Sequence, residues 1–534
     1  MAGINTSRQT GSTSAPGEAE LATNAEALAG TDTARIVTPD DLKYVLDRRI
    51  QEYYGVTWDE SADTYVRTGS TAGQTCGVTL ADAFLSVHRR LRRCLLNDDG
   101  TVNYYLCATD STKKEDGITA SVLTGADGQV MVEIPKFYYR YEYSGTSHTW
   151  EISPVPLTGF KVHEMFMSDT TEKDYVYIGA YEGVLYDTSQ TAYVGGCYQT
   201  SVSAVFATSD DSITIATRTG WATGLTVGQK LAVSGTTNNN GTVTVKAIKS
   251  ATAITVDENL TDETAATTVI QSILDATATT GDKLSSVSGF LPMTGNASVG
   301  TRAHFRVFAS NRGTGWTQEF ADVMSGIQLL ILTEYASFYT QSVLGYGIAA
   351  VAGWAAYNDY NPIAKTGNSN VKGHTTYNTA TSAITTGAGA KDVYLNYRGI
   401  ENPYGHMWKF IDGFNVNNNI PYLCNNPTNF ADDTASNYTR PVDILDADVT
   451  MINANGYQNF LAKYGRAFLP TSVAAPADAS HKITDYYYQV SGWRVALSGG
   501  DAAAGASVGA FVLRVADVST DLSRLFAGRA VFRK

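Results

Sequence analysis

The segment from residue 396 to residue 415, NYRGIENPYGHMWKFIDGFN, constrains the fold of this chain most strongly. It combines a proline and several glycines with five large aromatic residues, Tyr397, Tyr404, Trp408, Phe410 and Phe414. Neither a simple helix nor a simple strand accepts this mixture. Glycine lets the backbone bend, and aromatic rings bury a large apolar area. We therefore predict a compact arrangement of loops and short strands whose aromatic rings form a core.

The composition favours a soluble, β-rich protein. The chain has 534 residues, of which 43% are hydrophobic and only 17% are charged, and it contains 48 glycines and 32 tyrosines. Aromatic and β-branched residues suit pleated sheets, and glycine suits turns. The length predicts roughly three or four folded units. The net charge of -13 without a long basic tract argues against nucleic-acid binding and suits a protein or glycan partner.

The cysteines and the apolar pattern limit the function further. Cys76, Cys94, Cys107, Cys197 and Cys424 are widely spaced and form no CxxC pair, so we predict free thiols and no zinc ribbon. The N-terminus has no apolar leader, and no run of about 18 apolar residues occurs. These patterns predict synthesis in a cytoplasm and no membrane insertion.

Residues 1–52 are predicted to form a flexible arm followed by a helix. The first 20 or so residues are polar and rich in Gly, Ser and Thr. The sequence TPDD at 38–41 is a strong helix start, with Thr38 as N-cap and Pro39 at the first helical position. The residues that follow place one apolar stripe on the helix: Leu42, Val45, Leu46 and Ile50.

Residues 53–200 are predicted to form an aromatic-rich β domain, either separate or part of the C-terminal body. Within it, the apolar spacing of Phe84, Val87, Leu91 and Leu95 predicts a helix over 80–96. Alternation in QVMVEIPKFYYRYEY predicts one long strand over 129–143.

Residues 201–274 differ from their surroundings because they are rich in Thr, Ser, Val and Ala and contain no Tyr. Short alternating runs separated by glycine turns predict a small all-β, barrel-like module inserted into the larger unit. Residues 275–534 form the C-terminal domain, for which we predict an α+β fold. It contains a predicted helix over 318–339 and a long surface loop over 357–392.

Several C-terminal motifs together resemble a known family. These are YRGIENPYGHMWKFIDGFN, the earlier stretch QLLILTEYASFYTQSVLG, and a closing series of strand and turn signals. The closing series runs in the order Trp493, Gly499-Gly500, Gly505, Gly509-Ala510-Phe511, Gly528-Arg529 and Phe532. They resemble the C-type-lectin-like, formylglycine-generating-enzyme-like domain of bacteriophage tail-fibre and tropism-determinant proteins. The segment AEALAGTDTARIVTPDDL is similar to attachment segments of phage fibre and collar proteins.

The resemblance implies a homotrimeric phage virion protein, a tail-fibre or tail-tip adhesin. Its N-terminal segment would bind other virion proteins, and its lectin-like domain would bind a glycan or protein receptor on the host-cell surface. The scaffold would include Tyr397, Gly399, Asn402, Gly405, Trp408 and Asp412. The implied receptor contacts are Tyr486, Tyr487, Tyr488, Trp493, Ser498, Asp501, Ser507, Val508, Arg514, Asp517, Ser519 and Asp521. The three tyrosines at 486–488 could instead fill a core or a subunit interface.

Three alternatives remain open from the sequence. The first is a capsid-bound decoration or head-fibre protein of the same fold, and the second is a glycan-degrading depolymerase. No pattern singles out the carboxylate pair that a depolymerase needs. The family that the C-terminal motifs resemble also includes a copper-dependent enzyme that oxidises cysteine and holds its metal with a pair of cysteines, and this pair is missing because only Cys424 lies in the C-terminal half. We therefore expect no enzyme activity and no cofactor. The third concerns calcium, which suits the oxygen ligands of Asp412, Asn415 and Asn417–Asn419, although an Asn-rich turn that saturates its own backbone explains them better.

Overall fold

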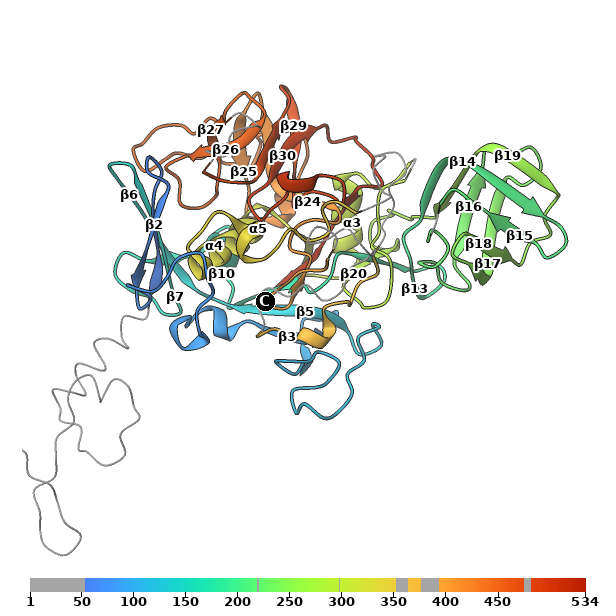
Figure 1. The fold of residues 1–534 in the computed structure, drawn as a ribbon, viewed down its shortest axis with the longest axis horizontal. Coiled ribbons are helices and arrows are strands. Elements are labelled where there is room, and N and C mark those ends of the chain that lie inside the picture. Colours follow the sequence, from blue (N-terminus) through green and yellow to red (C-terminus); the bar gives the residue numbers. More distant parts are fainter. Residues whose placement is uncertain (1–52, 219, 297, 352–363, 376–392, 475–481) are drawn as a thin grey trace, which may run out of the picture.

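A computed structural model describes residues 53–534 except 219, 297, 352–363, 376–392 and 475–481. The protein is mainly β, and a small β-barrel projects from one side of a larger body (Figure 1). The predicted N-terminal arm and helix, residues 1–52, and most of the predicted loop 357–392 lie outside the described residues.

A five-stranded antiparallel sheet forms one end of the body. Trp58 and Trp150 are completely buried in it, and Phe338 packs against both rings at centroid distances of 4.9 and 5.9 Å. The strand order is β2 (Thr64–Gly69), β1 (Tyr54–Asp59), β7 (Ser147–Ser153), β6 (Tyr138–Ser144) and β8 (Lys161–Val162).

A six-stranded antiparallel sheet joins strands from residues 92–179 with strands from the C-terminal region. The strand β32 lies in its interior, paired with β21 on one side and β11 on the other. The order is β21 (Trp316–Gln318), β32 (Ala530–Arg533), β11 (Tyr175–Gly179), β5 (Gln129–Pro135), β3 (Arg92–Leu96) and β4 (Val102–Tyr105). Strands from 53–200 and from the C-terminal region therefore share one sheet.

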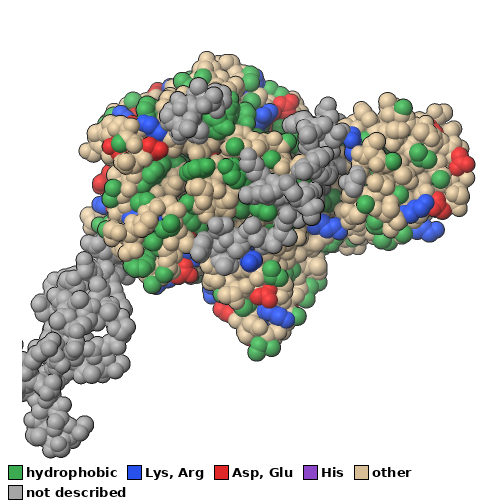
Figure 2. All heavy atoms as spheres, viewed as in Figure 1, with side chains coloured by type: hydrophobic (Ala, Val, Ile, Leu, Met, Phe, Trp, Pro, Cys, Tyr) green, Lys and Arg blue, Asp and Glu red, His purple; other side chains and the backbone are tan. Residues whose placement is uncertain are grey.

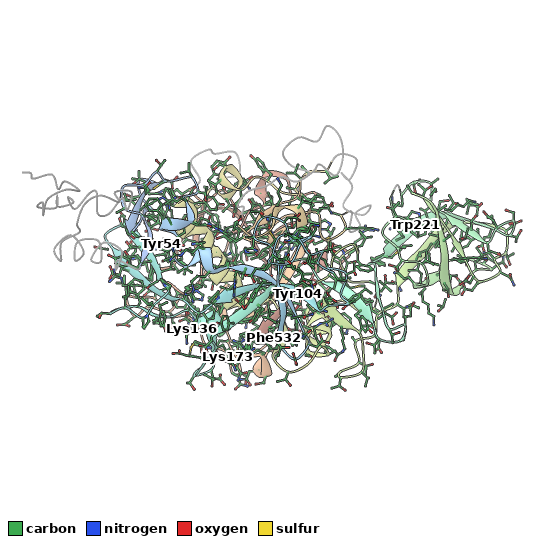
Figure 3. All side chains as sticks on the ribbon, turned by 90° about the horizontal axis from the view of Figure 1, so that it is seen from below. Tyr54, Tyr104, Lys136, Lys173, Trp221 and Phe532 are labelled. Atoms are coloured by element: carbon green, nitrogen blue, oxygen red, sulfur yellow. The ribbon has the colours of Figure 1, made fainter. Side chains whose placement is uncertain are left out.

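The predicted inserted module is a closed six-stranded barrel with its own core. It spans Tyr198–Ser272, close to the expected 201–274, and Trp221 is buried inside it. Figure 3 shows Trp221 in the barrel at the opposite end of the molecule from Tyr54. The barrel order is β14 (Tyr198–Ala207), β15 (Ser212–Thr214), β18 (Ala253–Val256), β17 (Gly241–Ser250), β16 (Lys230–Ser234) and β19 (Glu263–Ser272).

A three-stranded sheet, which we call the stem, connects the barrel to the body. Its order is β13 (Ala192–Val194), β12 (Val184–Asp187) and β20 (Lys283–Ser285). The barrel begins soon after β13 and ends shortly before β20, so both connections to the body run through the stem.

The C-terminal sheet has eight strands, and it includes two parallel pairs, β28 with β30 and β24 with β31. The order is β25 (Ile420–Leu423), β24 (Trp408–Asn417), β29 (Trp493–Ser498), β30 (Leu513–Asp517), β28 (Tyr486–Gln489), β26 (Gly456–Leu461) and β27 (Pro470–Ala474), with β31 (Phe526–Ala527) beside β24.

The remaining short elements are two hairpin-like pairs and several single turns of helix. The pairs are β9 (Met167–Ser168) with β10 (Thr171–Glu172) and β22 (Asn396–Tyr397) with β23 (Ile400–Glu401). The short helices are η1 (Asp82–Phe84), η2 (His88–Arg90), η3 (Glu164–Phe166), η5 (Asn370–Lys372), η7 (Pro427–Asn429), η8 (Gly505–Ser507) and α5 (Thr340–Val343).

Two longer helices pack against the sheets of the body. The helix α3 (Arg302–Ser310) is capped by Thr301, and it packs Phe305 and Phe308 against the C-terminal sheet and the stem. All 15 residues of α4 (Ala321–Tyr335) are buried, between β1 and β7 on one side and β24 on the other. A helix that is apolar on nearly all sides requires such a position.

Buried carboxylates at the two ends of α4 are neutralised by arginines from distant segments. Asp322 accepts hydrogen bonds of 2.6 and 2.8 Å from Arg466. Glu334 accepts a bond of 2.7 Å from Arg398, whose guanidinium also reaches Asp82 at 2.7 Å. Burial alone would raise the pKa of Glu334, but the charge of Arg398 holds it below its usual value.

The predicted helix over 80–96 is wrong. Residues 82–84 and 88–90 form single 3-10 turns, and residues 92–96 form β3 in the interior of the six-stranded sheet. Both faces of β3 are buried, so its sequence shows no strand-like alternation. The buried Arg93 donates to the backbone oxygen of Gly399 at 2.6 Å and to Ser369 at 2.8 Å, which links β3 to the 396–415 segment.

Two other element boundaries also differ from the prediction. The single strand over 129–143 is two strands, β5 and β6, which belong to different sheets and separate after Pro135. The helix predicted over 318–339 is α4 and ends at Tyr335, because Ala336 adopts a left-handed conformation with φ of 52°. Phe338 therefore lies beyond the helix. All five cysteines are free thiols, as predicted.

We predict that Arg398→Met destabilises the body by about 3–5 kcal/mol, because it leaves the buried Glu334 carboxylate without its cationic partner. The measurement is the midpoint of guanidinium-induced unfolding. The matched control is Arg440→Met, whose partner Asp448 is 58% exposed and whose loss costs about 1 kcal/mol or less. Equal midpoints for the two variants would contradict this role of Arg398.

We also predict that the barrel can be removed without unfolding the body. Tyr198 and Gln271 are paired neighbours, so a two-residue glycine linker between them can replace residues 199–270. The shortened protein should retain one cooperative thermal transition within a few degrees of the full chain, as followed by near-ultraviolet circular dichroism. Loss of that transition would show that the body depends on the barrel.

Candidate functional site

The C-terminal sheet displays a row of aromatic side chains on one face. Side chains alternate along a strand, so Tyr486 and Tyr488 of β28 lie on this face and Tyr487 lies on the other. Across neighbouring strands, Tyr457 of β26 pairs with Tyr486, and Tyr488 pairs with Arg514 of β30. The pairing therefore places residues from three strands side by side.

The rings of this face contact one another in sequence. Tyr457 meets Tyr486 edge-on at 5.2 Å, Tyr486 lies 4.4 Å from Tyr488, and Tyr488 meets Trp408 edge-on at 5.8 Å. The guanidinium carbon of Arg514 lies 5.7 Å from both the Trp408 and Tyr488 rings. We call Tyr457, Tyr486, Tyr488, Trp408 and Arg514 the aromatic row. Such edge-to-face and cation–π contacts hold the rings in defined orientations.

Hydrogen bonds fix the polar groups of the aromatic row. The Trp408 indole N–H donates to Asp501 at 2.8 Å, and the hydroxyls of Tyr488 and Ser507 lie 3.2 Å apart. Arg514 donates to both carboxylate oxygens of Asp517, one of them at 2.8 Å. Burial raises the pKa of Tyr488, so its hydroxyl stays protonated at neutral pH. The three tyrosines and Arg514 are partly exposed, whereas Trp408 and Asp501 are buried beneath them.

The loop 499–511 beside the aromatic row is held by buried polar side chains. Gln341 of α5 donates to the backbone oxygens of Ala506, at 2.7 Å, and of Val508. Gln328 of α4 donates to the backbone oxygen of Ala510 at 2.9 Å. These bonds attach the loop directly to the helical interior, and a loop fixed in this way can present side chains with little loss of entropy on binding.

Asp485 holds the end of this loop from within the core. Its carboxylate is completely buried and accepts the Phe511 N–H at 2.6 Å. A Cβ on Gly509 would lie only 2.0 Å from the same carboxylate, so the close approach requires glycine at this position. Burial raises the pKa of Asp485 to about 7.

The structure divides the predicted receptor contacts into two groups. Tyr487 is completely buried on the opposite face of the sheet and belongs to the core, and Ser498, Asp501, Val508 and Asp517 are also buried. The partly exposed residues are Tyr486, Tyr488, Trp493, Ser507, Arg514, Ser519 and Asp521.

The partly exposed group does not form one cluster. Trp493 pairs with Asn417 of β24, and its ring lies against Tyr422 at 5.8 Å. Ser519 bonds to Asp433, and Asp521 accepts the Val518 N–H at 2.8 Å. None of these three takes part in the contacts of the aromatic row. Tyr457 belongs to the row but escaped the sequence prediction, since only its strand partner Tyr486 places it there.

The residues predicted as scaffold are buried. Tyr397, Asn402, Trp408 and Asp412 are at most 3% exposed. Gly399 and Gly405 adopt φ of 94° and 75°, and an added Cβ would lie within 2.9 Å of Arg93 and Ile348, respectively. His406 within the segment pairs with the buried Glu182. Trp408 therefore has two roles, because it is part of the buried scaffold and also lies beneath the exposed tyrosines of the aromatic row.

Three of the side chains considered for calcium, Asp412, Asn415 and Asn418, have oxygens engaged by arginines or a backbone group. The buried Oδ1 of Asn419 has no hydrogen-bond partner among the described residues. Asp412 accepts hydrogen bonds from Arg306 at 2.6 and 2.8 Å, and Asn415 accepts one from Arg302. The oxygen of Asn418 accepts the Gly492 N–H at 2.9 Å. Within the described part of the chain, no group of three or more His, Cys, Asp or Glu residues is placed to hold a metal ion. Among the helices described there, none is long and apolar enough to cross a membrane.

Comparison with protein families and with curated proteins gave no match to this chain.

The raised pKa of Asp485 predicts a specific pH dependence of stability. The folded protein binds this proton more tightly than the unfolded chain, whose Asp has a pKa of 3.8. This contribution is complete below about pH 4 and is lost as the pH rises through about 7. Asp485→Asn stays uncharged, so its thermal midpoint should match the wild type at about pH 4 and exceed it by a growing margin up to about pH 8.

The control for this prediction is Asp446→Asn, which alters an exposed carboxylate. Its difference from the wild type should stay constant over the same pH range. If Asp485→Asn also shows a constant difference, Asp485 is ionised throughout the range and does not hold the loop as a neutral acid.

Proposed function

We propose that this chain is a bacteriophage adhesin that binds a host-cell surface glycan or protein through the aromatic row. The observation that carries the proposal is the row itself. It places three partly exposed tyrosines and an arginine on a rigid sheet, beside the loop 499–511 that buried side chains hold in place. Tyrosine provides a large, rigid contact area and a hydroxyl at a low entropic cost, which suits recognition.

The order of elements in the C-terminal region supports a C-type-lectin-like domain within residues 275–534. The strand β29 begins at Trp493, the turn at Gly499-Gly500 follows, and β30 comes after the loop. The final strand β32 follows Gly528-Arg529. This is the order that the resemblance to phage fibre proteins implies. The burial of the 396–415 segment also supports its proposed role as scaffold.

The surface of the barrel supports a role as a spacer. Figure 2 shows that most of its visible face is uncharged (tan), and that the charged side chains in view lie near its margin. We propose that the barrel projects from the adhesin and makes no contact with the receptor at the aromatic row.

The proposed assembly is a homotrimer attached to the virion, on the tail or capsid, through residues 1–52. Light scattering of the purified protein would then give a mass three times that of the chain. A monomer at micromolar concentration would contradict this part of the proposal and leave the receptor surface unaffected.

We predict that Tyr486→Ser combined with Tyr488→Ser weakens binding to host cells by roughly 30-fold or more, the effect of removing a central aromatic contact. The measurement is binding of fluorescently labelled protein to cells. Point variants are required because removal of residues 486–534 would delete β32 from the six-stranded sheet. The matched control is Tyr175→Ser, which alters a tyrosine that is 36% exposed on β11.

Two outcomes would contradict this proposal. Equal binding by the double variant and the control would exclude the aromatic row as the receptor surface. Release of oligosaccharide from host polysaccharide, abolished by Asp501→Asn, would show that the surface is catalytic.

A further inference from the structure

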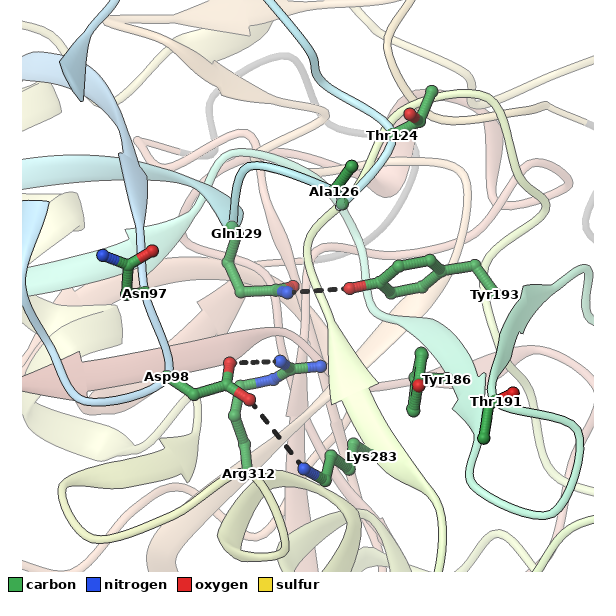
Figure 4. Close-up of a pocket in the computed structure, with 12 residues that line it drawn as sticks. Asn97, Asp98, Thr124, Ala126, Gln129, Tyr186, Thr191, Tyr193, Lys283 and Arg312 are labelled. Atoms are coloured by element: carbon green, nitrogen blue, oxygen red, sulfur yellow. Dashed lines mark hydrogen bonds and ion pairs between the residues drawn. The ribbon is translucent and has the colours of Figure 1, made fainter. Parts of the chain in front are cut away.

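A pocket lies where the stem meets the body, away from the strands of the aromatic row. It has a volume of about 540 Å³, within the range of small-ligand sites. One wall comes from the stem and the other from the loops that flank β3 and β5, together with Arg312, which follows the end of α3 (Figure 4). We call it the junction pocket.

One side of the junction pocket is ionic. The buried Arg312 is fixed by the backbone oxygen of Leu284 at 3.0 Å, and it donates to Asp98 at 2.6 Å. Lys283 lies 3.8 Å from the second oxygen of Asp98 and is 30% exposed. Arg312 is thus paired with Asp98, whereas the Lys283 ammonium is held only loosely. The three groups leave one net positive charge in the pocket.

The other side is aromatic and carries a fixed hydroxyl. Tyr186 and Tyr193 meet edge-on at 5.0 Å. The buried Gln129 uses its oxygen to accept the Ser286 N–H at 2.9 Å, and its amide group donates to the Tyr193 hydroxyl at 3.0 Å. Figure 4 shows Gln129 and Tyr193 pointing toward each other across the pocket. Because the hydroxyl accepts this bond, its own proton is directed elsewhere and can be donated to a ligand.

A glycine sets the position of the Tyr193 ring. A Cβ on Gly125 would lie 2.2 Å from that ring, and the backbone there has φ of 100°. Only glycine permits this approach without displacement of the ring. The aromatic wall is therefore defined by the loop that precedes β5 as well as by the stem.

We propose that the junction pocket binds a sugar unit that carries one carboxylate, such as a uronic acid residue of a glycan. Tyrosine rings cover the apolar faces of a sugar, and the Tyr193 hydroxyl and the Asp98 carboxylate supply a donor and an acceptor for its hydroxyl groups. The Lys283 ammonium pairs with the sugar carboxylate, which balances the net positive charge. A phosphate group suits the pocket less well, because the donors of Arg312 are already engaged by protein acceptors.

The test is saturation-transfer NMR on the full chain with D-glucuronate and D-glucose as probes. We expect glucuronate to bind in the millimolar range and glucose to bind roughly tenfold more weakly, because it lacks the charge-assisted bond to Lys283. Lys283→Met should weaken glucuronate binding roughly tenfold, and the control Lys246→Met, on the exposed surface of the barrel, should leave it unchanged.

A second variant tests the pocket without removal of a charge. Ala126→Phe adds a ring at the pocket edge and should abolish glucuronate binding while the thermal midpoint stays that of the wild type. No signal from glucuronate, equal signals from both sugars, or equal binding by the Lys283 and Lys246 variants would each overturn the proposal. Tyr486→Ser with Tyr488→Ser should retain glucuronate binding, so failure of the adhesin proposal and failure of this one are distinguishable.

Discussion

The structure depends on neutralising two carboxylates at the ends of a completely buried helix. An unpaired charge in such a position costs several kcal/mol, so α4 can be buried only if Arg466 and Arg398 reach Asp322 and Glu334. Arg398 belongs to the 396–415 segment, and its second bond to Asp82 also fixes the turn that precedes β3. One ion-pair network therefore brings together α4, the 396–415 segment and the N-terminal strands of the body.

The same helix also helps to hold the loop 499–511 in place. Gln328 of α4 and Gln341 of α5 face the loop 499–511 and bind its backbone oxygens. The aromatic row lies beside that loop, and Trp408 of the 396–415 segment is the buried residue beneath its tyrosines. The position of a partly exposed surface is thus determined by polar groups that are themselves buried, which explains how a loop-rich region can keep one conformation.

The sequence predicted features that depend on local composition. The barrel was recognisable because its Thr- and Val-rich strands contrast with the Tyr-rich body, and the burial of residues such as Tyr397 followed from the mixture of aromatics and glycines. Features that depend on distant pairing were not predictable. Leu91 and Leu95 have helical spacing, but burial of β3 on both faces removes the alternation that identifies a strand. Similarly, Tyr486 and Tyr487 look equivalent in sequence, and only strand pairing separates the surface residue from the core residue.

The interior position of β32 has a consequence for synthesis. The Arg529 guanidinium bonds to the backbone oxygen of Gly179, 350 residues earlier, and β32 pairs directly with β11. At a translation rate of about 5–20 residues per second, β11 waits roughly 20–70 s on the ribosome for its neighbour. During that time the β11 edge of the six-stranded sheet is unpaired and open to association with other nascent chains. The barrel has no such delay, because all its strands lie within one short stretch, and it can fold while the body is still incomplete.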